Sequence, residues 1–100
     1  MSNKKCPLQK FLRELGGKWS LVIVWHINDG KTGFNEIKKA IGPISAKVLS
    51  EKLKDLQLHK VITRKTLGGN PPRVKYQLTK KGHSLLPVMT VLHDWGDKHL

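Results

Sequence analysis

The sequence predicts an α+β domain in which helices come first, a two-stranded hairpin follows and a further helix closes the fold. Three observations carry this prediction. Apolar residues recur at helical spacing up to about residue 57, alternate with polar residues over about 61–78, and return to helical spacing after Thr79. The 100 residues are enough for one core and too few for two, so residues 1–100 are expected to form a single domain.

Three short helices are expected in the first half of the chain. The first follows Cys6-Pro7 and ends at Gly16-Gly17, because a pair of glycines stops a helix. The second, residues 18–27, is apolar nearly all round and therefore belongs in the middle of the core. The third, residues 34–41, is closed by Gly42-Pro43.

A fourth helix is expected from Ser45, a good N-cap, to about Gln57. At about 100° per residue, its apolar residues fall on one side and its polar residues on the other. The polar side is mostly basic and is centred on Lys47, Ser50, Glu51 and Lys54.

The next segment predicts a hairpin. Residues 61–66 are rich in β-branched side chains, and Val74, Tyr76 and Leu78 alternate with polar residues, while the loop 67–72 holds two glycines and two prolines. The solvent face of the hairpin is expected to carry Arg73 and Lys75, with Arg64 or Lys65 opposite them according to the register.

A last helix is expected after Thr79, with Pro87 marking a kink or a late start. Its apolar stripe consists of Leu85, Val88 or Met89, Leu92 and Trp95. A stripe in a helix that follows a completed core points to a partner chain. The alternative is that the helix folds back on its own domain.

The charge indicates the class of partner. Nineteen Lys and Arg against seven Asp and Glu give +12, which attracts polyanions, with nucleic acid the first candidate and an anionic membrane surface the second. The longest apolar run, residues 21–25, is too short to cross a bilayer, and the first six residues lack the apolar run of a signal peptide. One cysteine excludes an internal disulfide, so a cytoplasmic protein with no membrane partner is expected.

Short helices followed by a basic hairpin are the element order of a winged helix-turn-helix domain. In a helix-turn-helix the second helix of the motif, here about 45–57, lies in the major groove. Lys47, Ser50 and Lys54 would offer donors to base edges, whereas Glu51 would accept from cytosine or pair with Lys54. The wing, about 61–78, would contact phosphate or the minor groove through Arg64, Lys65, Arg73 and Lys75. Either basic set alone is more simply interpreted as a solvated surface. Both sets together favour double-stranded DNA as the binding partner.

Several strings resemble the HxlR-type regulators, a winged-helix family close to the MarR group. The two most specific are Leu15-Gly16-Gly17-Lys18-Trp19, after Cys6-Pro7, and the wing strand Pro71-Pro72-Arg73-Val74-Lys75-Tyr76-Gln77-Leu78-Thr79. Gly33-Phe34-Asn35-Glu36-Ile37 and Ile44-Ser45-Ala46-Lys47-Val48-Leu49 are similar to the family's helix-turn-helix, and Gly82, Leu85, Pro87, Leu92, Trp95 and Gly96 match its terminal helix. The resemblance spans residues 6 to about 96.

The resemblance implies a bacterial or archaeal transcription factor that binds DNA as a homodimer on an inverted-repeat operator. It adds Asn35, Ser45 and Ala46 to the expected DNA contacts. Because the first and last helices make most of the dimer interface in that family, it implies an added C-terminal dimerisation helix and an interface of Leu8, Phe11, Leu12, Leu85, Met89, Leu92 and Trp95. The chain departs from the family pattern at Gly33, where a basic residue is usual, at Lys75, where an acid is frequent, and at His59-Lys60, where Gly-Leu is common.

The single cysteine, Cys6, lies just before the first helix. Some members of the family sense oxidants or electrophiles through a cysteine at this place, so the resemblance implies a redox or electrophile sensor. Lys4, Lys5 and a helix N-terminus beside the thiol would favour the thiolate. The alternative is a small buried apolar group.

The chain shows no catalytic pattern, since it has no Ser/His/Asp set, no paired carboxylates and no phosphate-cradling glycine loop. No enzyme is expected. The five histidines lack the spacing of metal ligands, so neither a metal nor another cofactor is expected, and no effector is singled out. Two alternatives stay open: a sequence-neutral architectural or RNA-binding winged helix, and a protein-interaction module whose basic faces serve solubility.

Overall fold

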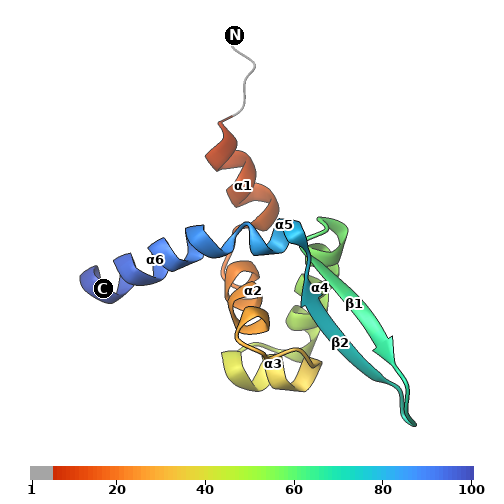
Figure 1. The fold of residues 1–100 in the computed structure, drawn as a ribbon. Helices are drawn as coiled ribbons and strands as arrows, with labels where there is room; N and C mark the ends of the chain where they lie inside the picture. Colours follow the sequence, from red (N-terminus) through yellow and green to blue (C-terminus); the bar gives the residue numbers. More distant parts are fainter. Residues whose placement is uncertain (1–5) are drawn as a thin grey trace.

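The computed structural model describes residues 6–100 and shows a winged helix-turn-helix with an additional C-terminal helix (Figure 1). This confirms the predicted α+β fold class. In chain order the elements are α1 (Pro7–Leu15), α2 (Ser20–Asn28), α3 (Phe34–Ile41), α4 (Ala46–Leu58), β1 (Ile62–Leu67), β2 (Arg73–Leu78), α5 (Lys80–His83) and α6 (Leu86–His99).

Helix α2 lies at the centre of the core, as its all-round apolar sequence predicts. Ile23 and Val24 have no exposed surface, and Ile27 is 5% exposed. Ile37 of α3 and the apolar side of α4 pack around them. Fully burying one such side chain stabilises the fold by about 1.5–3 kcal/mol, so this cluster fixes α3 and α4 relative to each other.

The hairpin is a two-stranded antiparallel sheet whose register places Lys65 opposite Lys75 and Arg64 opposite Tyr76. Residues directly opposite each other share a face of the sheet. Lys65 and Lys75 therefore lie on one face, and Arg64 lies on the other with the buried Tyr76. The backbone N–H of Tyr76 donates to the carbonyl of Thr32 at 2.8 Å, which attaches the hairpin to the segment before α3.

The predicted C-terminal helix is divided into α5 and α6. Thr79 caps α5, because its hydroxyl oxygen accepts from the N–H of Gly82 at 3.0 Å. Helix α6 begins only at Leu86, with Pro87 in its first turn, so the late start is the outcome rather than a kink.

Helices α1 and α6 project away from the body of the domain (Figure 1). The radius of gyration is 14.9 Å, against about 13 Å for a compact domain of this length. Leu8 and Leu12 of α1 are 63% and 56% exposed, and Leu92 and Trp95 of α6 are 53% and 56% exposed.

The apolar stripe of the last helix therefore has two parts. Met89 is only 4% exposed and belongs to the core, and the half-buried Leu85 packs against that core. The prediction that both lie on an exposed interface is wrong for Met89, because the first turn of α6 still rests on α2. The exposed apolar residues of α6 lie on both sides of Met89; they are Val88, Val91, Leu92 and Trp95.

Candidate nucleic-acid interface

Helix α4 presents a polar surface, and its N-terminus is fixed by a side-chain cap. The Ser45 hydroxyl accepts from the N–H of Val48 at 3.1 Å, which satisfies one of the free donors of the first turn. Ile44, before the cap, is 3% exposed and anchors the turn in the core. The predicted contact residues are exposed except for the half-buried Ser50; they are Ser45, Ala46, Lys47, Glu51 and Lys54.

Helix α3 precedes this helix in the helix-turn-helix. Asn35 lies exposed in its first turn. The N–H of Gly33 donates to the Glu36 carboxylate at 3.0 Å, so a side chain of α3 itself caps the N-terminus of this helix. Gly42 has φ +93°, in the left-handed region, and ends α3 with the sharp turn that leads to α4.

The wing cations are divided by the register of the hairpin. Lys65 and Lys75 are cross-strand partners, and Arg73 shares their face because it lies two residues before Lys75. Arg64 lies on the face that looks toward α4. The sequence left the choice between Arg64 and Lys65 open, and the register assigns Lys65 to the face of Arg73 and Lys75.

Among residues 6–100, no Lys or Arg of α4 or the wing forms an ion pair with a carboxylate. Over residues 6–100, ion pairs within 4.0 Å join only Arg13 to Glu14, His59 to Glu14 and His93 to Asp94. The expected pair between Glu51 and Lys54 is therefore not formed. Both side chains therefore stay available to a ligand.

The surface of α4 meets the wing at a cavity of about 360 Å³, whose lining includes Ser50, Lys54, Gln57, Arg64 and Tyr76. Sequence reasoning missed Gln57 as a member of this surface. Its position three residues after Lys54, on the same side of the helix, was the signal that could have found it.

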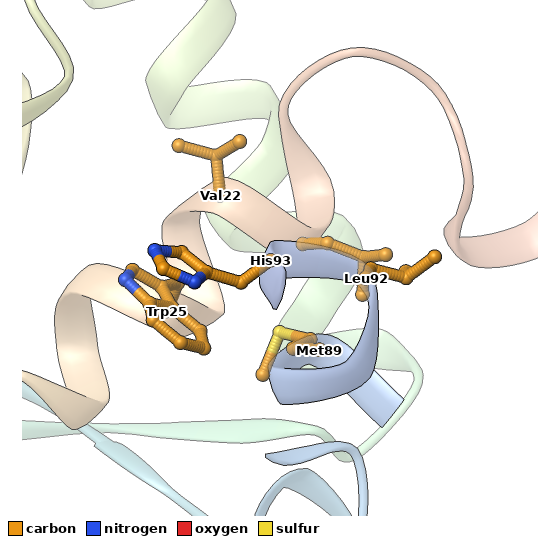
Figure 2. A pocket seen from close by; sticks show the side chains of 6 residues that line it. Val22, Trp25, Met89, Leu92 and His93 are labelled. Carbon is orange, nitrogen blue, oxygen red and sulfur yellow. The ribbon is translucent and has the colours of Figure 1, made fainter. Parts of the chain in front are cut away.

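A second opening lies between α2 and α6 and is mostly apolar. It has a volume of about 290 Å³, and Val22, Trp25 and Leu92 are among its lining residues (Figure 2). The rings of Trp25 and His93 stack with centroids 5.2 Å apart and planes 10° apart. Since the opening adjoins the exposed part of α6, it extends the apolar surface of that helix.

Cys6, at the start of α1, is exposed and free. It is not the buried apolar group of the alternative interpretation. Lys4 and Lys5, expected to favour its thiolate, lie outside the described residues. Within residues 6–100, no group of three His, Cys, Asp or Glu side chains is placed to hold a metal ion. In the same part of the chain, no helix has the length and apolar character to span a membrane.

Comparisons with known proteins agree with this geometry. A family model described as HxlR-like helix-turn-helix matches residues 14–100. The chain is 38% identical over 94 residues to YdeP of Bacillus subtilis, an uncharacterized HTH-type transcriptional regulator, and the match covers 94% of this chain and 73% of YdeP.

Two solved structures have a similar fold. The redox regulator HypR in its oxidized form superposes with a TM-score of 0.88 at 32% identity, covering 95% of this chain and 98% of HypR. The reduced form of the transcriptional regulator YodB from B. subtilis superposes with a TM-score of 0.79 at 34% identity, covering 96% of this chain and 95% of YodB. Because the family model covers most of the chain and the winged-helix fold agrees with it, the chain belongs to the HxlR-like helix-turn-helix family of DNA-binding transcription regulators.

Proposed function

We propose that this protein is a cytoplasmic, sequence-specific transcription regulator that acts as a homodimer on an inverted-repeat operator. Helix α4 enters the major groove, and the wing contacts phosphates or the minor groove. The observation that carries the proposal is that the polar side of α4 and the wing, both basic and both without carboxylate partners among residues 6–100, meet at one cavity.

Base recognition is assigned to α4. Lys47, Ser50 and Lys54 are one turn apart and donate to base edges. Glu51, which makes no ion pair among residues 6–100, accepts from a cytosine amino group. Asn35, Ser45 and Ala46 lie at the starts of the two motif helices and contact the adjacent backbone. On the wing, Lys65, Arg73 and Lys75 share a face that meets phosphate or the minor groove.

The dimer is assigned to the projecting helices. The exposed Leu8 and Leu12 of α1 and Leu92 and Trp95 of α6 are too apolar to face water without a partner, and the half-buried Phe11 lies between the two leucines of α1. A two-fold axis through this surface would set the α4 helices about 34–36 Å apart, one turn of DNA.

A redox response is assigned to Cys6. The thiol is exposed at the start of a proposed interface helix, where a disulfide to the partner or an alkyl group would change the spacing of the two α4 helices. The fold similarity to HypR, which is a redox regulator, supports this assignment.

DNA binding is tested by titrating the protein into a duplex selected from a random pool and into random duplexes, over a series of salt concentrations. The proposal expects a preference for the selected site of about 4–10 kcal/mol and a steep loss of affinity with salt. Equal affinity for all duplexes would indicate a sequence-neutral protein. Absence of binding at low salt would indicate a protein-interaction module.

The dimer is tested by sedimentation of Trp95→Glu beside Lys98→Glu, a charge change at an exposed position of the same helix. Trp95→Glu is expected to sediment as a monomer, because the carboxylate would be buried at the interface without a partner. Lys98→Glu is expected to remain a dimer. A dimeric Trp95→Glu variant would contradict the proposed interface.

The redox response is tested by measuring operator affinity before and after mild oxidation, with Cys6→Ser as the control. Oxidation is expected to change the affinity of the wild-type protein and to leave the Cys6→Ser variant unaffected. An equal response of the two proteins would remove Cys6 as the sensor.

A further inference from the structure

The cavity between α4 and the wing has the chemistry of an anion site. Two cations line it, Lys54 from α4 and Arg64 from β1, together with neutral groups that can donate hydrogen bonds. No acidic side chain is in its lining. We call this cavity the wing-base notch; the polar residues that define it are Ser50, Lys54, Gln57, Arg64 and Tyr76.

Arg64 reaches the notch because of the strand register. Its cross-strand partner Tyr76 is only 7% exposed, so this face of the hairpin is turned toward the domain. Lys65, the next residue, leaves the strand on the opposite face, with Lys75. Two adjacent cations thus serve different surfaces, and only Arg64 lies beside the recognition helix.

Neither cation of the notch has a carboxylate within 4.0 Å among residues 6–100. The planar guanidinium of an arginine can donate two parallel hydrogen bonds to a phosphate, and an ammonium group adds a point charge. Since no internal acid competes, this pair of cations is available to an outside oxyanion.

Gln57 supplies an oriented donor. Its Nε2 donates to the carbonyl of Leu53 at 3.2 Å, which restrains a side chain that is already half-buried. An amide nitrogen has two N–H groups, so a second donor remains for a ligand. Ser50, half-buried on the same helix, contributes a hydroxyl to the lining.

We infer that the wing-base notch binds a phosphate oxyanion, and that in the complex this is one phosphodiester of the DNA backbone, held between Arg64 and Lys54. The inference rests on the proposed DNA-binding function. It replaces the base contact proposed above for Lys54 with a backbone contact, and it gives Arg64 a different role from the other wing cations. Instead of probing the minor groove, Arg64 clamps the backbone beside α4 and sets how deeply that helix enters the major groove. The contact adds affinity without reading sequence.

The test compares Arg64→Gln with Lys65→Gln, two exposed residues that differ in the face they occupy. Duplexes of the selected site carry a single uncharged methylphosphonate at each backbone position in turn. For wild type and Lys65→Gln, one linkage is expected to weaken binding roughly tenfold, as for the loss of one charge-assisted hydrogen bond. For Arg64→Gln, that same linkage should weaken binding clearly less, because only Lys54 still contacts it, and the salt slope should fall by about 0.9. Arg64→Lys should restore sensitivity at that linkage in part.

The inference would be overturned if Arg64→Gln kept the wild-type sensitivity to every linkage. It would also be overturned if Lys65→Gln lost sensitivity at the same linkage to the same extent. Titration of the free protein with inorganic phosphate, followed by NMR of the Gln57 side-chain amide and the Arg64 guanidinium, separates this result from a failure of DNA binding. If the protein binds no DNA but phosphate shifts these two signals in wild type and not in Arg64→Gln, the notch binds a free oxyanion and the proposed function fails. If phosphate shifts neither signal and no linkage depends on Arg64, the notch is not a phosphate site.

Discussion

The carboxylate of Glu14 in α1 lies 3.6 Å from Nε2 of His59 at the end of α4. The other ring nitrogen, Nδ1, lies 2.9 Å from the carbonyl oxygen of Asp55 and must donate to it, so Nε2 attracts Glu14 only in the imidazolium form. The ammonium of Lys81 in α5 donates to the carbonyl of His59 at 2.8 Å. His59 therefore joins α1, α4 and α5 at a position where Gly-Leu is common in the family.

This contact predicts a measurable coupling between α1 and α4. In a double-mutant cycle with Glu14→Gln and His59→Gln, at a pH where His59 is protonated, the coupling free energy from urea unfolding is expected to be about 0.2–1 kcal/mol, since both side chains are roughly a third exposed. A cycle of Glu51→Gln with His59→Gln is the control, because Glu51 makes no ion pair among residues 6–100. Equal coupling in the two cycles would contradict a specific contact.

Lys60 is predicted to reduce stability through its backbone. Its φ of +61° is in the left-handed region, and the bonds Lys60 N–H to Gln57 carbonyl and Val61 N–H to Leu56 carbonyl, both 2.9 Å, form a Schellman motif. Lys60→Gly should raise the free energy of unfolding by about 0.5–1 kcal/mol, because glycine adopts this conformation without strain but is freer when unfolded. Thermal melts measure this as a rise of a few degrees in Tm. Lys60→Ala should show no comparable gain.

Gly82 is predicted to tolerate no side chain. A Cβ atom there would overlap the carbonyl oxygen of Val61, which is a backbone atom and cannot rotate away. Gly82→Ala should lower the free energy of unfolding by about 1–3 kcal/mol, as for an overpacked core position. Gly68→Ala is the matched control, since nothing lies within 4 Å of its Cβ position, and it should change the free energy by less than about 0.5 kcal/mol. Similar losses in both variants would argue against the contact with Val61.

Met89 is predicted to stabilise the fold of the single chain, and Leu92 is predicted to stabilise the association of two chains. Met89 is 4% exposed inside one chain, so Met89→Ala should cost about 2–5 kcal/mol at every protein concentration. Leu92 is 53% exposed, so Leu92→Ala should mainly weaken association and shift Tm only at concentrations where the proposed dimer forms. Calorimetric melts over a hundredfold range of concentration distinguish the two. A concentration-independent loss for Leu92→Ala would place that residue in the core of the single chain.

The sequence alone determined the class of fold and most of its elements, although not the division of the last helix into α5 and α6. The all-round apolar residues 18–27 predicted the buried α2, and Ser45 predicted the start of α4, where its hydroxyl is found on the N–H of Val48. Such features follow from the local spacing of side chains and from capping chemistry. Both depend only on residues that are close to one another in the sequence. The sequence strings that resemble the HxlR-type regulators indicated the same fold and predicted DNA as the partner.

Tertiary structure decided what depends on residues distant in the chain. Alternation in the wing is equally compatible with Arg64 or Lys65 opposite Lys75, and only the paired register turns Arg64 toward α4. The stripe of the last helix does not reveal where the core ends, and only the packing of α6 on α2 buries Met89 and leaves Leu92 exposed. The sequence thus determined which surfaces are basic or apolar, because that is a property of each element. Which of their residues line a common surface, as Arg64 and Lys54 line one cavity, was decided by the packing of one element on another.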